Sequence, residues 1–147
     1  MERAAAIITA AGSAAHTVNG GGDVQCVGGK PDGTPWRLGI ANPFLPGTLA
    51  LVVAGRDFAV ATSGTAERGA HIMNPHARGP AGGLASLTVV GPSLTLADAY
   101  ATAAFAMGPR LARQWAEDAI DGYDAFAMLP DGSTWQTSGF RRYASAP

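Results

Sequence analysis

The segment LTVVGPSLTLADAYATAAFAM, residues 87–107, carries the strongest fold signal of the chain. Residues 87–90 form a short apolar run that ends at a Gly-Pro pair, which is typical of a buried strand followed by a turn. An alanine-rich stretch follows at residues 95–107, with Ser93 or Thr95 as its N-cap and a glycine after its end. This stretch is mostly apolar on all sides, so we expect a helix buried against the sheet to which the strand belongs.

Short apolar segments separated by turns continue on both sides of this segment. The chain contains 20 glycines and 10 prolines, many of them between such segments, which favours short strands joined by turns. We therefore predict an α+β fold with a mostly antiparallel, twisted sheet and packed helices. The expected helices are residues 2–11, 95–107 and 111–120, and the expected strands are residues 16–18, 24–27, 36–40, 49–53, 58–61, 87–90, 125–129 and 134–137.

Turn residues indicate how these strands connect. Gly55-Arg56-Asp57 predicts a hairpin of residues 49–53 with 58–61, and Pro130-Asp131-Gly132 predicts a terminal hairpin. Residues 71–80 are expected to form an irregular loop.

Composition bounds the class of protein. The chain has 147 residues, 47% hydrophobic and 14% charged, so we expect one globular domain over residues 1–147. The net charge is −1 and the ten Lys and Arg residues form no run, which argues against a nucleic-acid partner. Cys26 lies in an apolar stretch and is expected in the core. The chain shows no secretory signal and no run of membrane-spanning length, so we expect a cytoplasmic protein without membrane insertion.

The first candidate site is the glycine-rich segment Asn19-Gly20-Gly21-Gly22-Asp23. Glycines after a strand allow backbone N–H groups to approach an oxyanion or a flat ring closely. Taken alone, a glycine-rich hairpin turn explains the segment equally well.

The second candidate is a pair of hydroxyls at the end of a predicted strand, Thr62-Ser63-Gly64, followed eight residues beyond Ser63 by His71. A histidine near neutral pKa can accept the proton of a hydroxyl nucleophile. An ordinary turn and a structural or exposed histidine are the alternatives.

The third candidate is Asp98 with Thr102, which stand four residues apart and therefore share one helix face. One carboxylate and one hydroxyl suit a hard cation such as Mg²⁺ when a nucleotide completes the shell. The alternative is a capping box of Thr95 with Asp98, which needs no metal.

The order of these segments resembles the ApbE family of FAD:protein FMN transferases. The similar segments are Val18–Val24, Trp36–Ile40 with Pro43, Val60–Gly64 with Glu67-Arg68, His71–Pro75, Thr88–Ser93, and Ala97–Ala99 with Thr102-Ala103, and Gly139-Phe140 ends the resemblance. The resemblance covers nearly the whole chain from residue 2, and six short pieces in the correct order are specific.

This resemblance implies a T-fold-like domain and a set of residue roles. Asp98 and Thr102 correspond to the family's metal ligands for Mg²⁺, and His71 would be the catalytic base. The residues expected to contact FAD are Asn19, Gly21, Gly22, Asp23, Thr62, Ser63, Gly64 and His71. The implied reaction transfers FMN from FAD to a Thr or Ser hydroxyl of an acceptor protein and releases AMP.

Family members are about twice this length, and the chain resembles their C-terminal half. The other half contributes flavin contacts and part of the metal site, and we expect FMN transfer by this chain alone or together with that N-terminal half. Two alternatives remain open: an Mg²⁺-dependent FAD pyrophosphatase, and a truncated, non-catalytic homologue that binds flavin or associates with itself.

Overall fold

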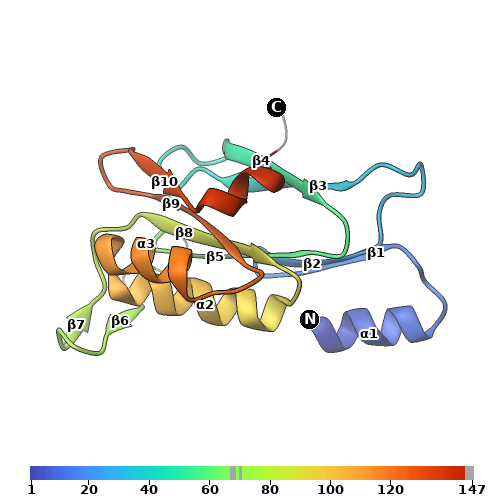
Figure 1. Cartoon of the computed structure of the whole chain (residues 1–147), viewed down its shortest axis with the longest axis horizontal. Helices are drawn as coiled ribbons and strands as arrows, with labels where there is room; N and C mark the ends of the chain where they lie inside the picture. The colour runs from blue at the N-terminus through green and yellow to red at the C-terminus, as the bar shows by residue number, and fades with distance from the viewer. Residues whose placement is uncertain (67–68, 70, 145–147) are drawn as a thin grey trace.

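The computed structural model describes residues 1–66, 69 and 71–144 of the chain. Its elements are α1 (Glu2–Ala10), β1 (His16–Gly20), β2 (Asp23–Val27), β3 (Trp36–Ala41), β4 (Leu49–Gly55), β5 (Ala59–Gly64), β6 (Met73–Asn74), β7 (Gly79–Pro80), β8 (Ser86–Gly91), α2 (Leu94–Met107), α3 (Pro109–Asp118), β9 (Asp124–Met128), β10 (Thr134–Gln136) and the 3-10 helix η1 (Ser138–Arg142). Figure 1 shows the arrangement in layers, with α2 and α3 on one face of the central sheet and β3, β4 and η1 on the other.

The central sheet confirms the predicted α+β class. It has six strands in the order β1-β2-β5-β8-β9-β10, and each neighbouring pair is antiparallel. The apolar run at residues 87–90 forms most of β8, all of whose residues are buried. An interior strand covered on both faces accounts for the continuous apolar pattern.

Alternating side chains of the sheet enter two separate cores. The sheet residues of the first core, which also contains side chains of α2 and α3, are Ala59, Ala61, Leu87, Val89, Ala125, Ala127 and Trp135. The sheet residues of the second core, which contains Ile40, Val53 and Phe140 from the other layer, are Val24, Cys26, Val60, Val90, Phe126 and Met128. The central sheet therefore holds both outer layers in place.

Helix α2 packs on β5 and β8 through small side chains. Ala97, Ala101 and Ala104 are fully buried, and alanines on both surfaces allow a helix to lie close to a sheet. The outer side of α2 is exposed and includes Asp98 and Thr102, so the helix is not buried on all sides.

The expected hairpin of residues 49–53 with 58–61 is wrong. β4 pairs with β3 in a separate two-stranded sheet, whereas β5 pairs with β2 and β8. The side chains of Val53 in β4 and Val60 in β5 contribute to the same core from different sheets. The strands therefore lie in separate layers, and the turn residues Gly55-Arg56-Asp57 carry the chain from one layer to the other.

Two smaller expectations also have clear outcomes. Residues 71–80, expected to be irregular, contain the short pairing of β6 with β7. Cys26 is fully buried as expected, and burial raises the pKa of its thiol to about 12.

Within the described part of the chain, no helix has both the length and the apolar character needed to cross a membrane.

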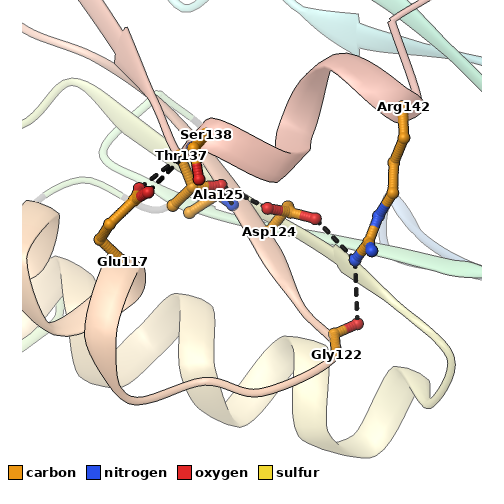
Figure 2. A network of polar contacts seen from close by, with 7 residues as sticks. All are labelled: Glu117, Gly122, Asp124, Ala125, Thr137, Ser138 and Arg142. Carbon is orange, nitrogen blue, oxygen red and sulfur yellow. Dashed lines mark hydrogen bonds and ion pairs between the residues drawn. The ribbon is translucent and has the colours of Figure 1, made fainter.

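A polar network fastens η1 to the central sheet and to α3 (Figure 2). The hydroxyl of Thr137 donates to Asp124 Oδ1 over 2.7 Å and accepts the N–H of Ala125 over 3.1 Å. The carboxylate of Glu117 accepts the N–H of Ser138, the first residue of η1, with 3.0 Å to Oε2. These contacts hold Phe140 in the second core, where its side chain is fully buried.

Candidate functional site

A cleft lies beside the place where β2 and β5 stop pairing. These strands pair only at Val24↔Val60 and Gln25↔Ala59. Asp23 Oδ1 accepts the N–H of Thr62 over 3.1 Å, so a side chain takes over where the backbone pairing ends. The cleft measures about 570 Å³, which is within the usual range for small-molecule sites.

Every residue that the sequence predicts for the site lines this one cleft. These residues are Asn19, Gly21, Gly22, Asp23, Thr62, Ser63, Gly64, His71, Asp98 and Thr102. They come from the β1–β2 hairpin, the end of β5, the loop before β6 and the outer side of α2. The fold thus brings together residues that are far apart in the sequence, with 83 positions between the numbers of Asn19 and Thr102 (102 − 19). The role of each residue stays a prediction.

The glycines of the β1–β2 turn have a structural reason of their own. Gly21 and Gly22 have φ angles of 69° and 98°, and a two-residue hairpin turn of this kind favours glycine because both positions need positive φ. Asn19 Oδ1 accepts the N–H of Gly22 over 3.3 Å. The turn alone therefore accounts for these residue types, although it also shapes one end of the cleft.

Two hydroxyl pairs connect β5 to neighbouring elements. Ser63 Oγ lies 3.2 Å from Thr102 Oγ1 on α2. Thr62 Oγ1 lies 2.8 Å from Thr88 Oγ1 on β8. Successive strand residues point to opposite faces, so the Ser63 pair faces the helices and the Thr62 pair faces the β3–β4 layer.

The start of α2 decides against a capping role for Asp98. The N-cap is Ser93, whose hydroxyl accepts the N–H of Leu96 over 3.4 Å, and the helix begins at Leu94. Thr95 lies inside the first turn, and its hydroxyl donates to Glu2 Oε2. Asp98 is therefore in the second turn, beyond the positions where a side chain caps free N–H groups.

Asp98 and Thr102 present a carboxylate and a hydroxyl from the exposed side of α2 to the cleft. Such oxygen donors fit a hard divalent cation. Among the described residues, there is no group of three or more His, Cys, Asp and Glu that could hold a metal. The pair fits a partial shell, with water, phosphate oxygens or donors from outside the described residues supplying the remainder.

His71 is exposed at the edge of the cleft, and one of its ring nitrogens is already engaged. Nδ1 lies 3.0 Å from the carbonyl oxygen of Gly69. A carbonyl only accepts hydrogen bonds, so Nδ1 carries the proton in this contact. In the neutral ring Nε2 is then unprotonated and able to accept a proton.

The cleft also contains a wall that sequence reasoning did not assign to the site. This wall is residues 37–43, from β3 and the loop after it, and it includes Arg37. A charged residue within an otherwise apolar strand was the available signal, since Arg37 stands between Trp36 and Leu38. An arginine here provides a positive charge beside the cleft.

A second, smaller hollow of about 310 Å³ lies beside η1. Its lining includes Glu117, Asp118 and Asp121 together with Arg142. It contains none of the residues predicted for the site, and two of its charged groups, Glu117 and Arg142, belong to the network of Figure 2.

The fold and the larger cleft define an α+β domain with a cleft of the size usual for small-molecule sites. Comparison with known proteins identifies it more narrowly, because the ApbE family model matches residues 1–127 and the chain belongs to that family. An FAD:protein FMN transferase of Rhodobacter capsulatus is 33% identical over 153 residues, covering 96% of this chain and 28% of the relative.

Solved structures agree with this assignment. The ApbE protein from Thermotoga maritima matches with a TM-score of 0.89 and 28% identity over 99% of this chain and 50% of that protein. The flavin transferase ApbE from Vibrio cholerae matches with a TM-score of 0.83 and 26% identity over 97% and 48%. The chain thus spans about half the length of these solved relatives.

Proposed function

We propose that this chain forms the cation- and hydroxyl-bearing part of an FAD:protein FMN transferase. The observation that supports it most directly is the single cleft shared by Asp98, Thr102, His71 and the end of β5. Two relatives that cover most of this chain carry that enzyme's name. The proposed reaction transfers FMN from FAD to a Thr or Ser hydroxyl of an acceptor protein.

The bonds of the proposed reaction balance without a further reactant. The acceptor hydroxyl oxygen forms a bond to the FMN phosphorus, and the bond from that phosphorus to the oxygen of the AMP phosphate breaks. AMP leaves with the bridging oxygen, and the hydroxyl proton passes to Nε2 of His71. Such a transfer depends mainly on alignment and charge stabilisation.

Asp98 and Thr102 would hold Mg²⁺, which supplies positive charge beside the pyrophosphate when bound. Arg37 adds a cationic side chain on the β3 wall of the same cleft. Phosphate oxygens that bridge the two walls would be fixed relative to His71. In this proposal α2 and β3 bind the phosphate groups of FAD, and His71 in the loop before β6 accepts the proton.

The proposal includes a complementary polypeptide that supplies the remainder of the family's fold. Large apolar side chains are exposed on α1 and on the loop between β3 and β4, including Ile7 (62%) and Leu45 (59%). Exposed apolar surface of this kind favours association with another chain. Activity is therefore to be measured both with and without the N-terminal half of a related transferase.

The decisive experiment incubates the chain with FAD, Mg²⁺ and an acceptor protein and detects in-gel flavin fluorescence and AMP. We expect a fluorescent acceptor and an equal amount of AMP. His71→Asn should abolish labelling. His76 is an exposed histidine between β6 and β7 that does not line the cleft, so His76→Asn should retain labelling.

Two outcomes would contradict the transferase proposal. AMP release from FAD without a labelled protein would indicate a pyrophosphatase instead. Absence of both products, even with the complementary half present, would leave only the non-catalytic alternative.

A further inference from the structure

Ser63 is buried inside the cleft wall and contacts Thr102 across two secondary-structure elements. Its exposed fraction is 8%, and its Oγ lies 3.2 Å from Thr102 Oγ1. The two residues are 39 positions apart in the sequence. Their contact therefore arises from the packing of α2 on β5.

A hydroxyl that binds a cation has to direct its proton away from the positive charge. The oxygen of Thr102 has two lone pairs and one proton, and binding through a lone pair requires an acceptor for that proton on the other side. On a helix the usual acceptor of a threonine hydroxyl is the carbonyl one turn earlier. Here the partner is instead Ser63 Oγ.

We propose that Ser63 is a positioning residue for the divalent-cation site, acting through Thr102. Ser63 Oγ accepts the hydroxyl proton of Thr102 and keeps the Thr102 oxygen lone pairs directed toward the cleft beside Asp98. This inference rests on the proposed function for the cation-binding role of Asp98 and Thr102. It adds a residue whose effect on the cation site passes through a second side chain.

Outer contacts of this kind fix metal ligands in orientation, and their removal typically lowers metal affinity by a factor of 10–100. For a single neutral hydroxyl we expect the lower end of that range, about tenfold. Ser63→Ala removes only the oxygen, and alanine is accommodated in a strand whose neighbours Ala59 and Ala61 face the same core.

The test measures the binding of Mn²⁺ to the full chain by its effect on water proton relaxation, in the absence of FAD. Mn²⁺ is a hard cation that prefers the same oxygen donors as Mg²⁺. We expect Asp98→Asn to abolish binding, and Ser63→Ala to weaken it about tenfold while the far-ultraviolet circular dichroism spectrum is unchanged.

A double-mutant cycle separates a positioning role from a direct one. If Ser63 acts through Thr102, Ser63→Ala has no further effect on Mn²⁺ affinity in a Thr102→Val background. Thr88→Val is the matched control, because it removes the other hydroxyl pair of β5, which faces the opposite layer. This control should leave Mn²⁺ affinity unchanged.

The possible failures are distinguishable. Unchanged Mn²⁺ affinity in Ser63→Ala, or an additive loss with Thr102→Val, would overturn the role of Ser63 and leave the Asp98 site intact. Absence of Mn²⁺ binding in the unmodified chain would overturn this inference together with the proposed cation site.

Discussion

Asp124 and Arg142 form an ion pair in which one partner is buried and the other is largely in solvent. Asp124 Oδ2 lies 2.7 Å from Arg142 Nη2, and the two side chains are 7% and 54% exposed, respectively. Arg142 belongs to η1, the last helix of the described chain, and Figure 2 shows its side chain reaching Asp124 and Gly122. The buried carboxylate therefore depends on a cation at the surface.

Because the carboxylate is buried and the guanidinium is exposed, removal of Arg142 alone should destabilise the protein more than removal of both charges. Arg142→Ala should destabilise the protein by about 2–3 kcal/mol, because the buried carboxylate loses its counter-ion. Asp124→Asn in the same background should restore part of that loss by removing the charge. Urea denaturation measures both, and a double variant less stable than Arg142→Ala alone would contradict the explanation.

The cap of α2 gives a second prediction. Ser93→Ala should cost about 1 kcal/mol, because the N–H of Leu96 loses its side-chain acceptor. Asp98→Ala should change the free energy of unfolding by less than about 0.5 kcal/mol, as expected for an exposed helix position without a cap. Thermal melts in the absence of divalent cations compare the two variants, and equal losses would return Asp98 to the capping interpretation.

The proposed cation site predicts a separation of activity from stability. Asp98→Asn keeps the shape but removes the charge, so Mg²⁺-dependent FAD turnover should fall at least tenfold while the melting temperature is retained. Thr102→Val should act in the same direction. Thr95→Val is the control, since its hydroxyl contacts Glu2 rather than the cleft. Full Mg²⁺-dependent turnover in Asp98→Asn and Thr102→Val would argue against the site.

Glu2 predicts how stability changes with acid. Hydrogen bonds from Ser93 and Thr95 lower the pKa of its carboxyl from the usual 4.5. A lowered pKa means that the carboxylate stabilises the folded state above pH 4.5 and that this contribution is lost as the pH falls through the lower folded-state value. Glu2→Gln should therefore reduce stability at neutral pH and converge with the unmodified protein once the pH falls below the lowered folded-state pKa of Glu2. Melting curves across this range test it, and a constant difference would contradict the assigned contacts.

The antiparallel sheet and its helices were predictable because each segment carries a local signal. The apolar run of β8 and the alanine-rich sequence of α2 lie next to each other in the chain, and the turn residues between them are unambiguous. The partner of β4 was not predictable in this way. Gly55-Arg56-Asp57 suits a hairpin as well as a crossing between layers, and the long-range pairing of β4 with β3 and of β5 with β2 and β8 decides between them.

The candidate site was located by segment order, but its internal contacts depend on packing. The contact of Ser63 with Thr102 joins residues without any common sequence pattern. Arg37 was not assigned to the site, and its place on the cleft wall is known only once β3 is packed beside the central sheet. Long-range layering is the part that local pattern does not encode.

The early end of the β2–β5 pairing has a thermodynamic consequence for any molecule that enters the cleft. Antiparallel strands alternate the side to which each residue directs its N–H and C=O groups. Residues 58 and 60 direct theirs toward β2, so Gly64 directs its own toward the same side, beyond the last residue pair of that ladder. At this edge Asp23 accepts the N–H of Thr62, whereas Gly64 lies beyond the β2–β5 pairing, so no strand pairing has to be broken for a molecule to enter the cleft. Because folding already places this edge of the sheet in the conformation that a ligand would meet, binding needs no rearrangement of the strands. More of the interaction free energy then contributes to affinity.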